Sequence, residues 1–393
     1  MKQKQRDRVL VLLTVLAVIG LLLLPTGFET EQFGETVKVR VLATDDSNIR
    51  QNGIIRTGDQ GLTVKILSGG QKGRMAEAVN HLYGKLELDK VFATGDTALA
   101  LLNGYGGEIL KITVVDHWRV GVELLLFLLF AGLLLWYAGA VGARALLSFV
   151  FCGLAIWKIL LPGALRGWEP VSLSLAVSAG LVVVVICLVS GTDRKSLAAI
   201  CGALAGIVCT WAMSMIFGPL FSIHGAIKPF SETLLYSGFG NLDLTGIFLG
   251  GIFLASTGAV MDLSMDIAAA MHELALKKPD LSRRELTRSG LAVGRLVVST
   301  MTTTLLLAYT GGFSSMLMVF IAQGTPILNV LNLQYVAAEI MHILVGSFGL
   351  VSVAPLTALL GGFLLAPGNM AQADAKQHIQ EEETDAKKQT QFS

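Results

Sequence analysis

The sequence predicts a polytopic α-helical membrane protein with a small all-β, OB-like barrel domain outside the cytoplasm. The chain of 393 residues is 53% hydrophobic and only 15% charged, whereas soluble domains carry about 25% charged residues. Several apolar runs reach the length of about 18 residues that a helix needs to cross a bilayer. One stretch, residues 26–119, instead alternates in short apolar and polar runs, which is typical of β-strands.

Residues 1–25 are the predicted N-terminal transmembrane anchor. Met1 to Arg8 is basic, and the apolar run Val9–Leu24 ends at Pro25. A cleaved signal peptide would look similar, but no A-x-A-like cleavage site follows the run, so we expect an uncleaved span. Its basic end would stay in the cytoplasm, and the next segment would be exported.

Residues 26–119 are the expected extracytoplasmic β-rich domain. Glycine-rich turn signals separate its period-two runs, and this suits a five- or six-stranded OB-like barrel. Residues 73–85 are interpreted as a short added helix. No basic, aromatic-rich face accompanies the runs, so we expect a packing or partner-binding module and no nucleic acid. The expected strands are Thr36–Leu42, Leu62–Leu67, Lys90–Phe92 and Ile109–Val115.

Residues 120–366 are the expected membrane domain of about seven or eight segments. Many of the 43 glycines lie in its apolar runs, where small residues let helices approach closely. Two late apolar segments, at 313–331 and 335–366, follow the clear spans. These spans are predicted near residues 120–140, 144–162, 171–190, 197–217, 243–262 and 291–310.

The connections between the predicted spans set the expected orientation. Those assigned to the inside carry Arg144, Asp193-Arg194-Lys195 and a basic cluster at residues 277–288. Those assigned to the outside carry only Arg166 and Lys228. Because cytoplasmic loops are enriched in lysine and arginine, we expect a multi-pass protein of the bacterial cytoplasmic membrane with its N-terminus inside.

The segment at 313–334 is expected to be broken or re-entrant. Pro326 lacks the backbone N–H that a helix needs, so the chain breaks in mid-run. A break there leaves the C-terminal tail, residues 367–393, in the cytoplasm, and its polar composition predicts disorder. Broken elements often line binding sites in transporters. The candidate residues of a permeation path are Gln323, Gly324, Thr325, Pro326 and Asn329.

Five charged or titratable residues form a candidate network. An ionisable group at the centre of a span costs about 2.5–3.5 kcal/mol on insertion scales, so it needs a partner or a water-filled cavity. Glu339 and His342 share a helix face and could relay protons or hold a cation. Asp262 and Asp266 also share a face and could form a buried network with Arg295. Solvated helix ends are the alternative for both groups.

The sequence argues against several kinds of chemistry. All four cysteines lie in apolar segments, which indicates small buried hydrophobes rather than disulfides or a zinc site. The single Glu-x-x-His spacing argues against a di-iron bundle. Neither a Walker loop nor a Gly-x-Ser-x-Gly motif is present, so we expect no ATP-driven transport by this chain. We therefore predict no catalytic residues, no metal and no cofactor, and an intramembrane enzyme is the least favoured class.

Five stretches carry a resemblance to a known family: Gly251–Asp262, Met265-Asp266, Ile327–Asn332, Ala338–Ile340 and Val345–Ser347. Together they resemble the YibE/F-like membrane proteins of bacteria. The resemblance covers about residues 30–366. It implies a multi-spanning membrane protein or permease and brings no substrate with it.

The sequence leaves two functions open. The first is a secondary permease driven by a proton or ion gradient, because polar groups lie within membrane segments and no nucleotide motif is present. The second is a non-transporting scaffold, in which the external barrel docks an envelope partner and the spans anchor and dimerise. Expected partners are the lipid bilayer and either a second copy or another membrane protein.

Overall fold

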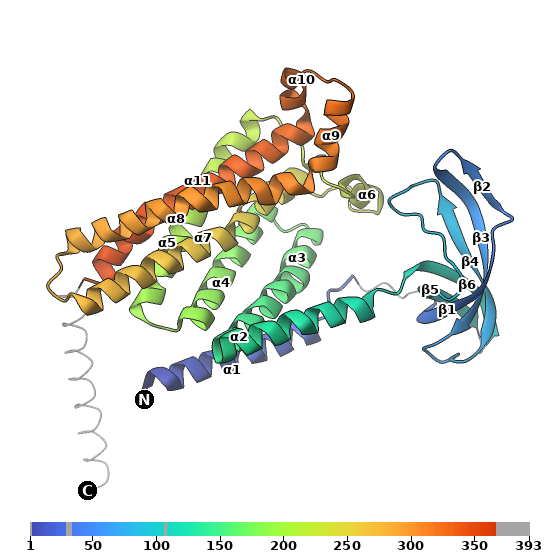
Figure 1. The fold of residues 1–393 in the computed structure, drawn as a ribbon, viewed down its shortest axis with the longest axis horizontal. Coiled ribbons are helices and arrows are strands. Elements are labelled where there is room, and N and C mark those ends of the chain that lie inside the picture. Colours follow the sequence, from blue (N-terminus) through green and yellow to red (C-terminus); the bar gives the residue numbers. More distant parts are fainter. Residues whose placement is uncertain (1, 29–33, 106–107, 367–393) are drawn as a thin grey trace, which may run out of the picture. The chain divides into compact units, whose positions relative to one another are not determined.

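The computed structural model describes residues 2–28, 34–105 and 108–366 (Figure 1). The chain divides into two compact units. Glu29–Tyr137 is the barrel unit, and Met1–Phe28 with Ala138–Ser393 is the helical unit. The predicted disordered tail, residues 367–393, lies outside the described residues.

Six strands build the barrel unit (Figure 1). β1 pairs with β3 on one side and with β5 on the other. β5 also pairs with β6, β6 pairs in parallel with β4, and β4 pairs with β3. Five strands therefore close into a barrel, as predicted, and β2 forms a hairpin on β3. The strands are β1 (Glu35–Asp45), β2 (Ile49–Asn52), β3 (Ile55–Ile66), β4 (Met75–Tyr83), β5 (Thr97–Tyr105) and β6 (Glu108–His117).

Alternating side chains explain the barrel core. In β1, Val37, Val39 and Val41 are fully or almost fully buried, whereas Lys38 and Arg40 lie on the opposite face. This is the period of two that a pleated strand imposes on its side chains. The inward-facing residues of the other barrel strands complete one hydrophobic core.

The sequence reading of the barrel missed strands β2 and β5 and was wrong at two further places. Residues 73–85 hold strand β4 and not a helix, because the alternating burial of Ala78, Asn80 and Leu82 prevails over the helical preference of their neighbours. The expected strand Lys90–Phe92 is a loop. Gln60 holds this loop, because its side-chain amide donates to Phe92 O at 2.9 Å and accepts from Phe92 N at 3.0 Å.

The helical unit and the junction contain eleven α-helices among the described residues. A π-helix, Ile156–Leu160, joins α2 to α3, and a 3-10 helix, Gly225–Ile227, precedes α6. The helices are α1 (Lys2–Leu23), α2 (Val120–Ala155), α3 (Leu161–Leu165), α4 (Pro170–Ser190), α5 (Arg194–Leu220), α6 (Ser231–Tyr236), α7 (Leu244–Lys277), α8 (Arg283–Gly312), α9 (Ser314–Ala322), α10 (Ile327–Asn332) and α11 (Gln334–Leu364).

Six helical runs in the described chain are long and apolar enough to cross a membrane. They are α4, α5, α7, α8, α11 and the continuous run Val120–Leu165. Gly139 interrupts that run with φ 53° and ψ −125°, so the two spans predicted there meet at a kink. The late segment at 313–331 is broken, as predicted. With 9 and 6 residues, α9 and α10 are too short to cross about 30 Å of hydrocarbon.

Small residues bring α5 and α11 together. A side chain on Gly202 or Gly349 would clash with Thr357 or Thr210 of the opposite helix. Close approach at small residues is a common way for membrane helices to pack. One core lies between α4, α5, α7, α8 and α11 and includes Ile267.

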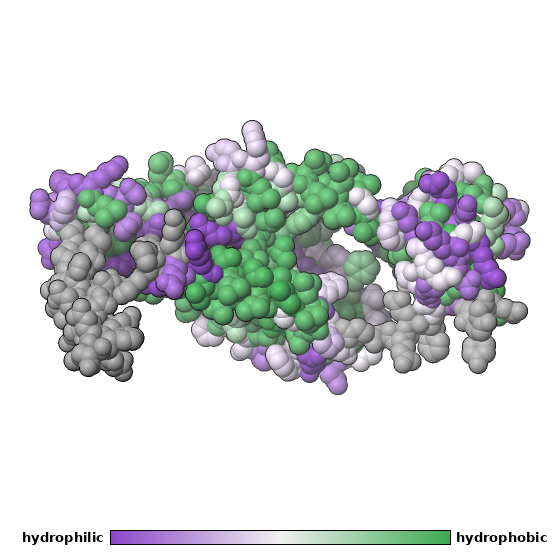
Figure 2. Space-filling view, turned by 90° about the horizontal axis from the view of Figure 1, so that it is seen from below, coloured by the Kyte–Doolittle hydropathy of each residue, from purple (hydrophilic) through white to green (hydrophobic). Residues whose placement is uncertain are grey.

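The outer surface of the helical unit is apolar. Leucine, valine, isoleucine and aromatic side chains are exposed along its helices, and Figure 2 shows them as a broad hydrophobic surface. Hydrophilic residues gather instead at the end that carries the loop between α7 and α8, and over the barrel (Figure 2). An exposed apolar belt of this kind is suited to lipid.

Candidate functional site

Glu339 is a buried carboxylate in a helix long enough to cross a membrane. It lies near the start of α11, and only 8% of the residue is exposed. Its neighbours Ala338 and Met341 are also buried, which places it on the packed face of the helix. A carboxylate in such surroundings requires a counter-charge, and Lys228 provides it through an ion pair between Lys228 Nζ and Glu339 Oε1.

Lys228 comes from the connection between α5 and α7, and local packing fixes that connection. Ile223 and Ile227 are buried in the same hydrophobic cluster as the start of α7. Gly225 packs so closely on Leu244 that a Cβ would clash with the Leu244 backbone. The amide of Gly225 also donates to the Thr245 hydroxyl at 3.3 Å. The loop is therefore held against α7 and presents the lysine to α11.

Two aromatic rings flank the Lys228 ammonium. The Nζ atom lies 5.6 Å from the ring centroid of Phe248 on α7 and 5.4 Å from that of Phe313 at the end of α8. Cations are attracted to the faces of aromatic rings at such distances. The lysine side chain is still 35% exposed, so the charge is partly desolvated and partly open to solvent.

His342 lies one helical turn along α11 from Glu339. Its Nδ1 atom is 3.9 Å from Glu339 Oε2, which is too long for a hydrogen bond. Both ring nitrogens are buried, and neither has a hydrogen-bond partner. The Tyr309 ring of α8 packs against the imidazole with 4.4 Å between centroids. An imidazole with both nitrogens available can accept a proton or donate one.

We refer to Lys228, Glu339, His342 and Tyr309 as the charge cluster. The predicted pair of Glu339 and His342 is therefore buried and lies together, but two further members come from elements distant in sequence. Sequence reasoning missed Tyr309, for which no local signal exists. The sequence did contain a signal for Lys228, because this lysine is one of only two cations in the connections assigned to the outside.

Asp262, Asp266 and Arg295 do not belong to the charge cluster. All three residues are exposed, on α7 and α8. Within the described residues, no ion pair joins Arg295 to either aspartate. The expected buried network of five charged residues is therefore absent from the structure, and only Glu339 and His342 lie together.

The helical phase of α7 explains this outcome. Its buried face carries Leu263 and Ile267, and the residue immediately before each of them is an aspartate. Because a helix turns by about 100° per residue, each aspartate points away from the packed face. Sequence spacing showed that Asp262 and Asp266 share a face, but it did not show which face packs.

The break at Gln323–Pro326 has a different local structure from the one expected. Gly324 has a positive φ of 64°. The Gly324 amide donates to Ile321 O, and the Thr325 amide donates to Phe320 O. This pattern is a Schellman cap, which satisfies the carbonyls at the end of α9, so the expected unpaired groups are not found there. Gln323, Gly324, Pro326 and Asn329 are exposed, and Thr325 is partly buried. A role of these residues in a permeation path stays a prediction.

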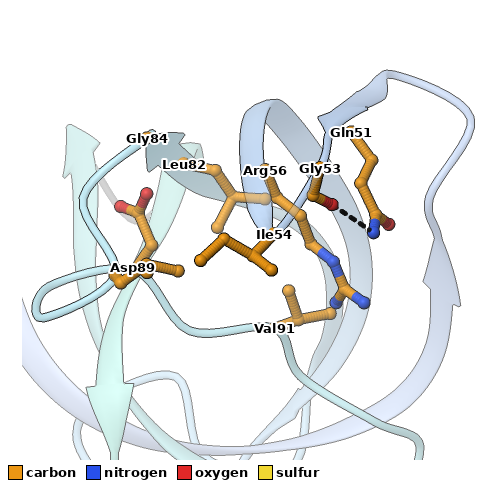
Figure 3. Close-up of a pocket in the computed structure, with 9 residues that line it drawn as sticks. Gln51, Gly53, Ile54, Arg56, Leu82, Gly84, Asp89 and Val91 are labelled. Carbon is orange, nitrogen blue, oxygen red and sulfur yellow. Dashed lines mark hydrogen bonds between the residues drawn. The ribbon is translucent and has the colours of Figure 1, made fainter. Parts of the chain in front are cut away.

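A second candidate site is a cleft of about 450 Å³ in the barrel unit (Figure 3). In Figure 3, Ile54 lies between the Arg56 guanidinium on one side and the Asp89 carboxylate on the other. The Asp89 carboxylate accepts hydrogen bonds from the amides of Tyr83 and Lys85 at 2.9 and 2.8 Å. Desolvation raises the pKa of Asp89, but these bonds, with one from the Gly84 amide and the charge of Lys90, outweigh it and hold that pKa below its usual value. The cleft therefore carries an anion and a cation beside apolar side chains.

Metal chemistry has no evident centre in this structure. Among the residues that the structure describes, no group of three or more His, Cys, Asp or Glu side chains is arranged to hold a metal ion. The four cysteines are all free thiols.

The comparisons with known proteins identify a family. The sequence profile of the family described as YibE/F-like protein matches residues 126–367, which is more than half of the chain and includes most of the helical unit. No curated protein and no solved structure matches this chain. On the strength of the profile match, the chain belongs to the YibE/F-like family.

Proposed function

We propose that this chain is a secondary permease in which proton uptake by Glu339 is coupled to movement of the Lys228 loop. The observation that supports this is a buried carboxylate in a membrane helix, neutralised by a lysine from a connecting loop and adjacent to an unbonded histidine. Ionisable groups in membrane segments are costly, and they commonly mark proton relays and ion pathways.

In this proposal the ion pair is the switch. A proton taken up by the Glu339 carboxylate removes its negative charge, so the attraction that holds Lys228 is lost. Lys228 can then turn toward water, since more than a third of its side chain is already exposed. Its loop is bounded by two non-glycine residues with positive φ, Ser222 at 52° and Phe230 at 63°. Such strained backbone is often found in segments that move.

His342 supplies the route for the proton. It can take a proton from Glu339 or return one to it, because its Nδ1 lies 3.9 Å from the carboxylate and needs only a small shift to reach it. Tyr309 limits that movement by covering one face of the ring. The exposed residues Asp262, Asp266 and Arg295 have no part in this step.

The proposed orientation places the charge cluster near the outer face. Lysine and arginine concentrate at the opposite end of the helices, in the connection between α7 and α8. We count α1, the two halves of Val120–Leu165 on either side of Gly139, α4, α5, α7, α8 and α11 as crossings, and α9 and α10 as none. These eight crossings would return the tail to the side of Met1, which we propose is the cytoplasm. The membrane would be the bacterial cytoplasmic membrane.

The test uses the full chain reconstituted into liposomes that contain a pH-sensitive dye. A potassium diffusion potential, negative inside, is imposed in the presence of candidate solutes such as divalent cations and amino acids. We expect wild-type proteoliposomes to acidify faster than empty liposomes with at least one solute, and Glu339→Gln to reduce the difference about tenfold or more. The matched control is Glu273→Gln, an exposed glutamate on α7. Equal rates for Glu339→Gln and wild type would contradict the proposal.

The scaffold alternative is favoured by one observation, the barrel cleft with its exposed Ile54 and Leu86 beside Arg56. In that case the barrel docks a partner and the helices only anchor it. Deletion of residues 27–119 distinguishes the two functions. A permease core retains proton flux without the barrel, whereas a scaffold never produces flux above that of empty liposomes.

A further inference from the structure

One end of the barrel carries exposed apolar side chains on two neighbouring segments. Ile54 in the turn between β2 and β3 is 76% exposed, and Leu86 in the connection after β4 is 63% exposed. The two segments adjoin, because both residues line the barrel cleft, where Figure 3 shows Ile54. Ile55, Tyr83 and Leu88 lie on the same segments and are between 40% and 73% exposed. We call these five residues the apolar tip.

Local structure holds the apolar tip outward. Gly53, with a positive φ of 63°, forms the turn that carries Ile54. The Asp89 carboxylate accepts hydrogen bonds from two backbone amides at the start of the loop that carries Leu86, and so fixes that loop. Turns and loops are usually formed by polar residues and glycine. Large apolar side chains that are exposed together therefore indicate a binding surface.

The apolar tip lies at the end of the barrel from which the chain continues into α2. β4 and β6 pair in parallel through Val79 and Thr113. Tyr83 at the end of β4 and His117 at the end of β6 are therefore at the same end of the barrel. The segment after β4 also adjoins the end of β6, since the rings of Phe92 and His117 are 4.6 Å apart.

The link from this end of the barrel to a long apolar helix is very short. Only Trp118 and Arg119 separate His117 from Val120, where α2 begins. Val120 belongs to the same compact unit as the barrel, and it starts a run long and apolar enough to cross a membrane. A crossing that begins at Val120 brings lipid headgroups to this end of the barrel. Tryptophan and tyrosine, present here as Trp118 and Tyr83, are enriched where hydrocarbon meets water.

The charges beside the apolar tip nearly balance. Arg56 and Lys85 are cationic, and Glu87 and Asp89 are anionic. Asp89 already accepts from backbone amides, whereas no ion pair in the described part of the chain involves Arg56. The Arg56 guanidinium is therefore available to a phosphate oxygen. Because the net charge is close to zero, apolar contact would carry the binding, and an anionic lipid is not required.

We propose that the apolar tip inserts into the bilayer interface next to the barrel, so that the barrel docks on lipid beside its own span. Ile54, Leu86 and Leu88 enter the boundary between headgroups and acyl chains, where amphipathic elements lie about 5–10 Å deep. Arg56 donates to a headgroup phosphate. This surface lies in the barrel, apart from the charge cluster, and its role is independent of proton transfer by Glu339.

The experiment attaches a fluorophore to single cysteines of the full chain, after the four native cysteines are replaced by alanine. The chain is held in nanodiscs of phosphatidylcholine whose acyl chains carry nitroxide quenchers near the headgroups. The labelled variants are Glu87→Cys in the apolar tip and Lys111→Cys near the start of β6, both at exposed positions. We expect lipid quenching at position 87 to exceed that at position 111 about threefold or more, because only position 87 lies in the interface.

A second substitution tests the apolar contact itself. Ile54→Asp should lower the quenching at position 87 to the level at position 111, because a carboxylate does not enter the interface readily. The matched control is Leu110→Asp, which replaces a leucine that is 72% exposed near the start of β6, at the opposite end of the barrel. It should leave the quenching at position 87 unchanged. Both side chains are mostly exposed, so neither substitution disturbs the barrel core.

Three results would overturn this proposal. The first is equal lipid quenching at positions 87 and 111, and the second is unchanged quenching at position 87 in Ile54→Asp. The third is a dye at position 87 that lipid does not quench in nanodiscs but that is protected from aqueous iodide in membrane vesicles of the producing cells. That pattern would assign the apolar tip to a protein partner instead of the bilayer.

Discussion

The Gln60–Asn80 network of the barrel and the charge cluster of the helical unit differ in how their buried polar groups are satisfied. In the barrel, the Gln60 side chain makes hydrogen bonds with Asp46, Asn80 and Phe92, and Asn80 also donates to Lys90 O. These two residues are 0% and 2% exposed, and neither has a side-chain N or O atom that is buried without a partner. In the charge cluster, by contrast, both ring nitrogens of His342 lack partners.

The difference indicates which polar groups are structural. A fully satisfied buried network rigidifies a fold and specifies its core. A partly satisfied network costs stability, and it is retained where chemistry or movement needs the free groups. The amides of Gln60 and Asn80 therefore hold the barrel, and the charge cluster is the better candidate for function.

The largest loss of stability is expected when the hydrogen-bond network of Gln60 and Asn80 is broken. Replacing Gln60 with Leu removes one of the two hydrogen bonds of Asn80 and leaves both backbone groups of Phe92 without this partner. At roughly 1–3 kcal/mol for each buried unsatisfied group, the free energy of unfolding of the barrel should fall by about 3–5 kcal/mol. Hydrogen exchange of the β3 and β4 amides in the full chain measures the change.

Gln51→Leu is the matched control for that substitution. Gln51 is exposed, and its side chain makes one hydrogen bond, to Gly53 O at 3.0 Å (Figure 3). Its loss should change the free energy by about 0.5 kcal/mol or less. If both glutamine variants lost the same stability, the amide of Gln60 would not be what holds the barrel.

A smaller loss of stability is expected when the ion pair of the charge cluster is broken. Lys228→Met leaves Glu339 buried without a counter-charge, and this should cost about 2 kcal/mol, less than for a fully buried pair because Lys228 is partly solvated. The double variant with Glu339→Gln should recover most of the loss, since no charge is then left unpaired. Thermal unfolding of the full chain in lipid nanodiscs measures both.

Lys158→Met is the control for the lysine. Lys158 is a lysine of the helical unit that donates to Leu24 O at 2.8 Å without neutralising a buried acid. Its replacement should cost less than that of Lys228, and Glu339→Gln should not compensate for it. A double variant as unstable as Lys228→Met alone would show that the two charges are not coupled.

Much of the fold could be predicted from the sequence, because local periodicity reports it directly. The alternation in β1 and the apolar runs of α4, α5, α7 and α11 each depend on neighbours in the chain. Strand β5 was missed, since its alanines and leucines have little β preference and its burial comes from pairing with β1 and β6.

The site was predicted only in part, because its contacts join distant segments. Glu339 and His342 are neighbours on one helix, so their spacing sufficed. Lys228 lies 111 residues before Glu339, and only the fold brings them together. The orientation of Asp262 toward the surface likewise depends on which face of α7 packs, and a single sequence does not specify this when small and apolar residues cover most of the helix.

Partly exposed charged side chains in the barrel are a third kind of polar group, and their replacement should change the stability of the barrel least. Partial burial raises the pKa of Asp116, but hydrogen bonds from Arg119 and the His117 amide, with the charge of Lys90, outweigh it and hold that pKa below its usual 3.8. The ion pairs measure 2.9 Å to Arg119 and 3.3 Å to Lys90. Because the pKa is lowered in the folded state, the stabilisation by Asp116 is fully present above about pH 4 and is lost as pH falls through the lower pKa of the folded state.

Asp116→Asn should therefore destabilise the barrel slightly at pH 6, and the difference should disappear as pH falls through the lowered pKa of Asp116, where the wild type loses the same contribution. The effect should be the smallest of the series and should shrink with added salt, because the carboxylate is about one-third exposed and screened. Hydrogen exchange of the β5 and β6 amides, corrected for intrinsic rates at each pH, measures it, with the exposed Glu87→Gln as control. A pH-independent loss in Asp116→Asn would mean that this side chain acts through its hydrogen bonds alone and not through its charge.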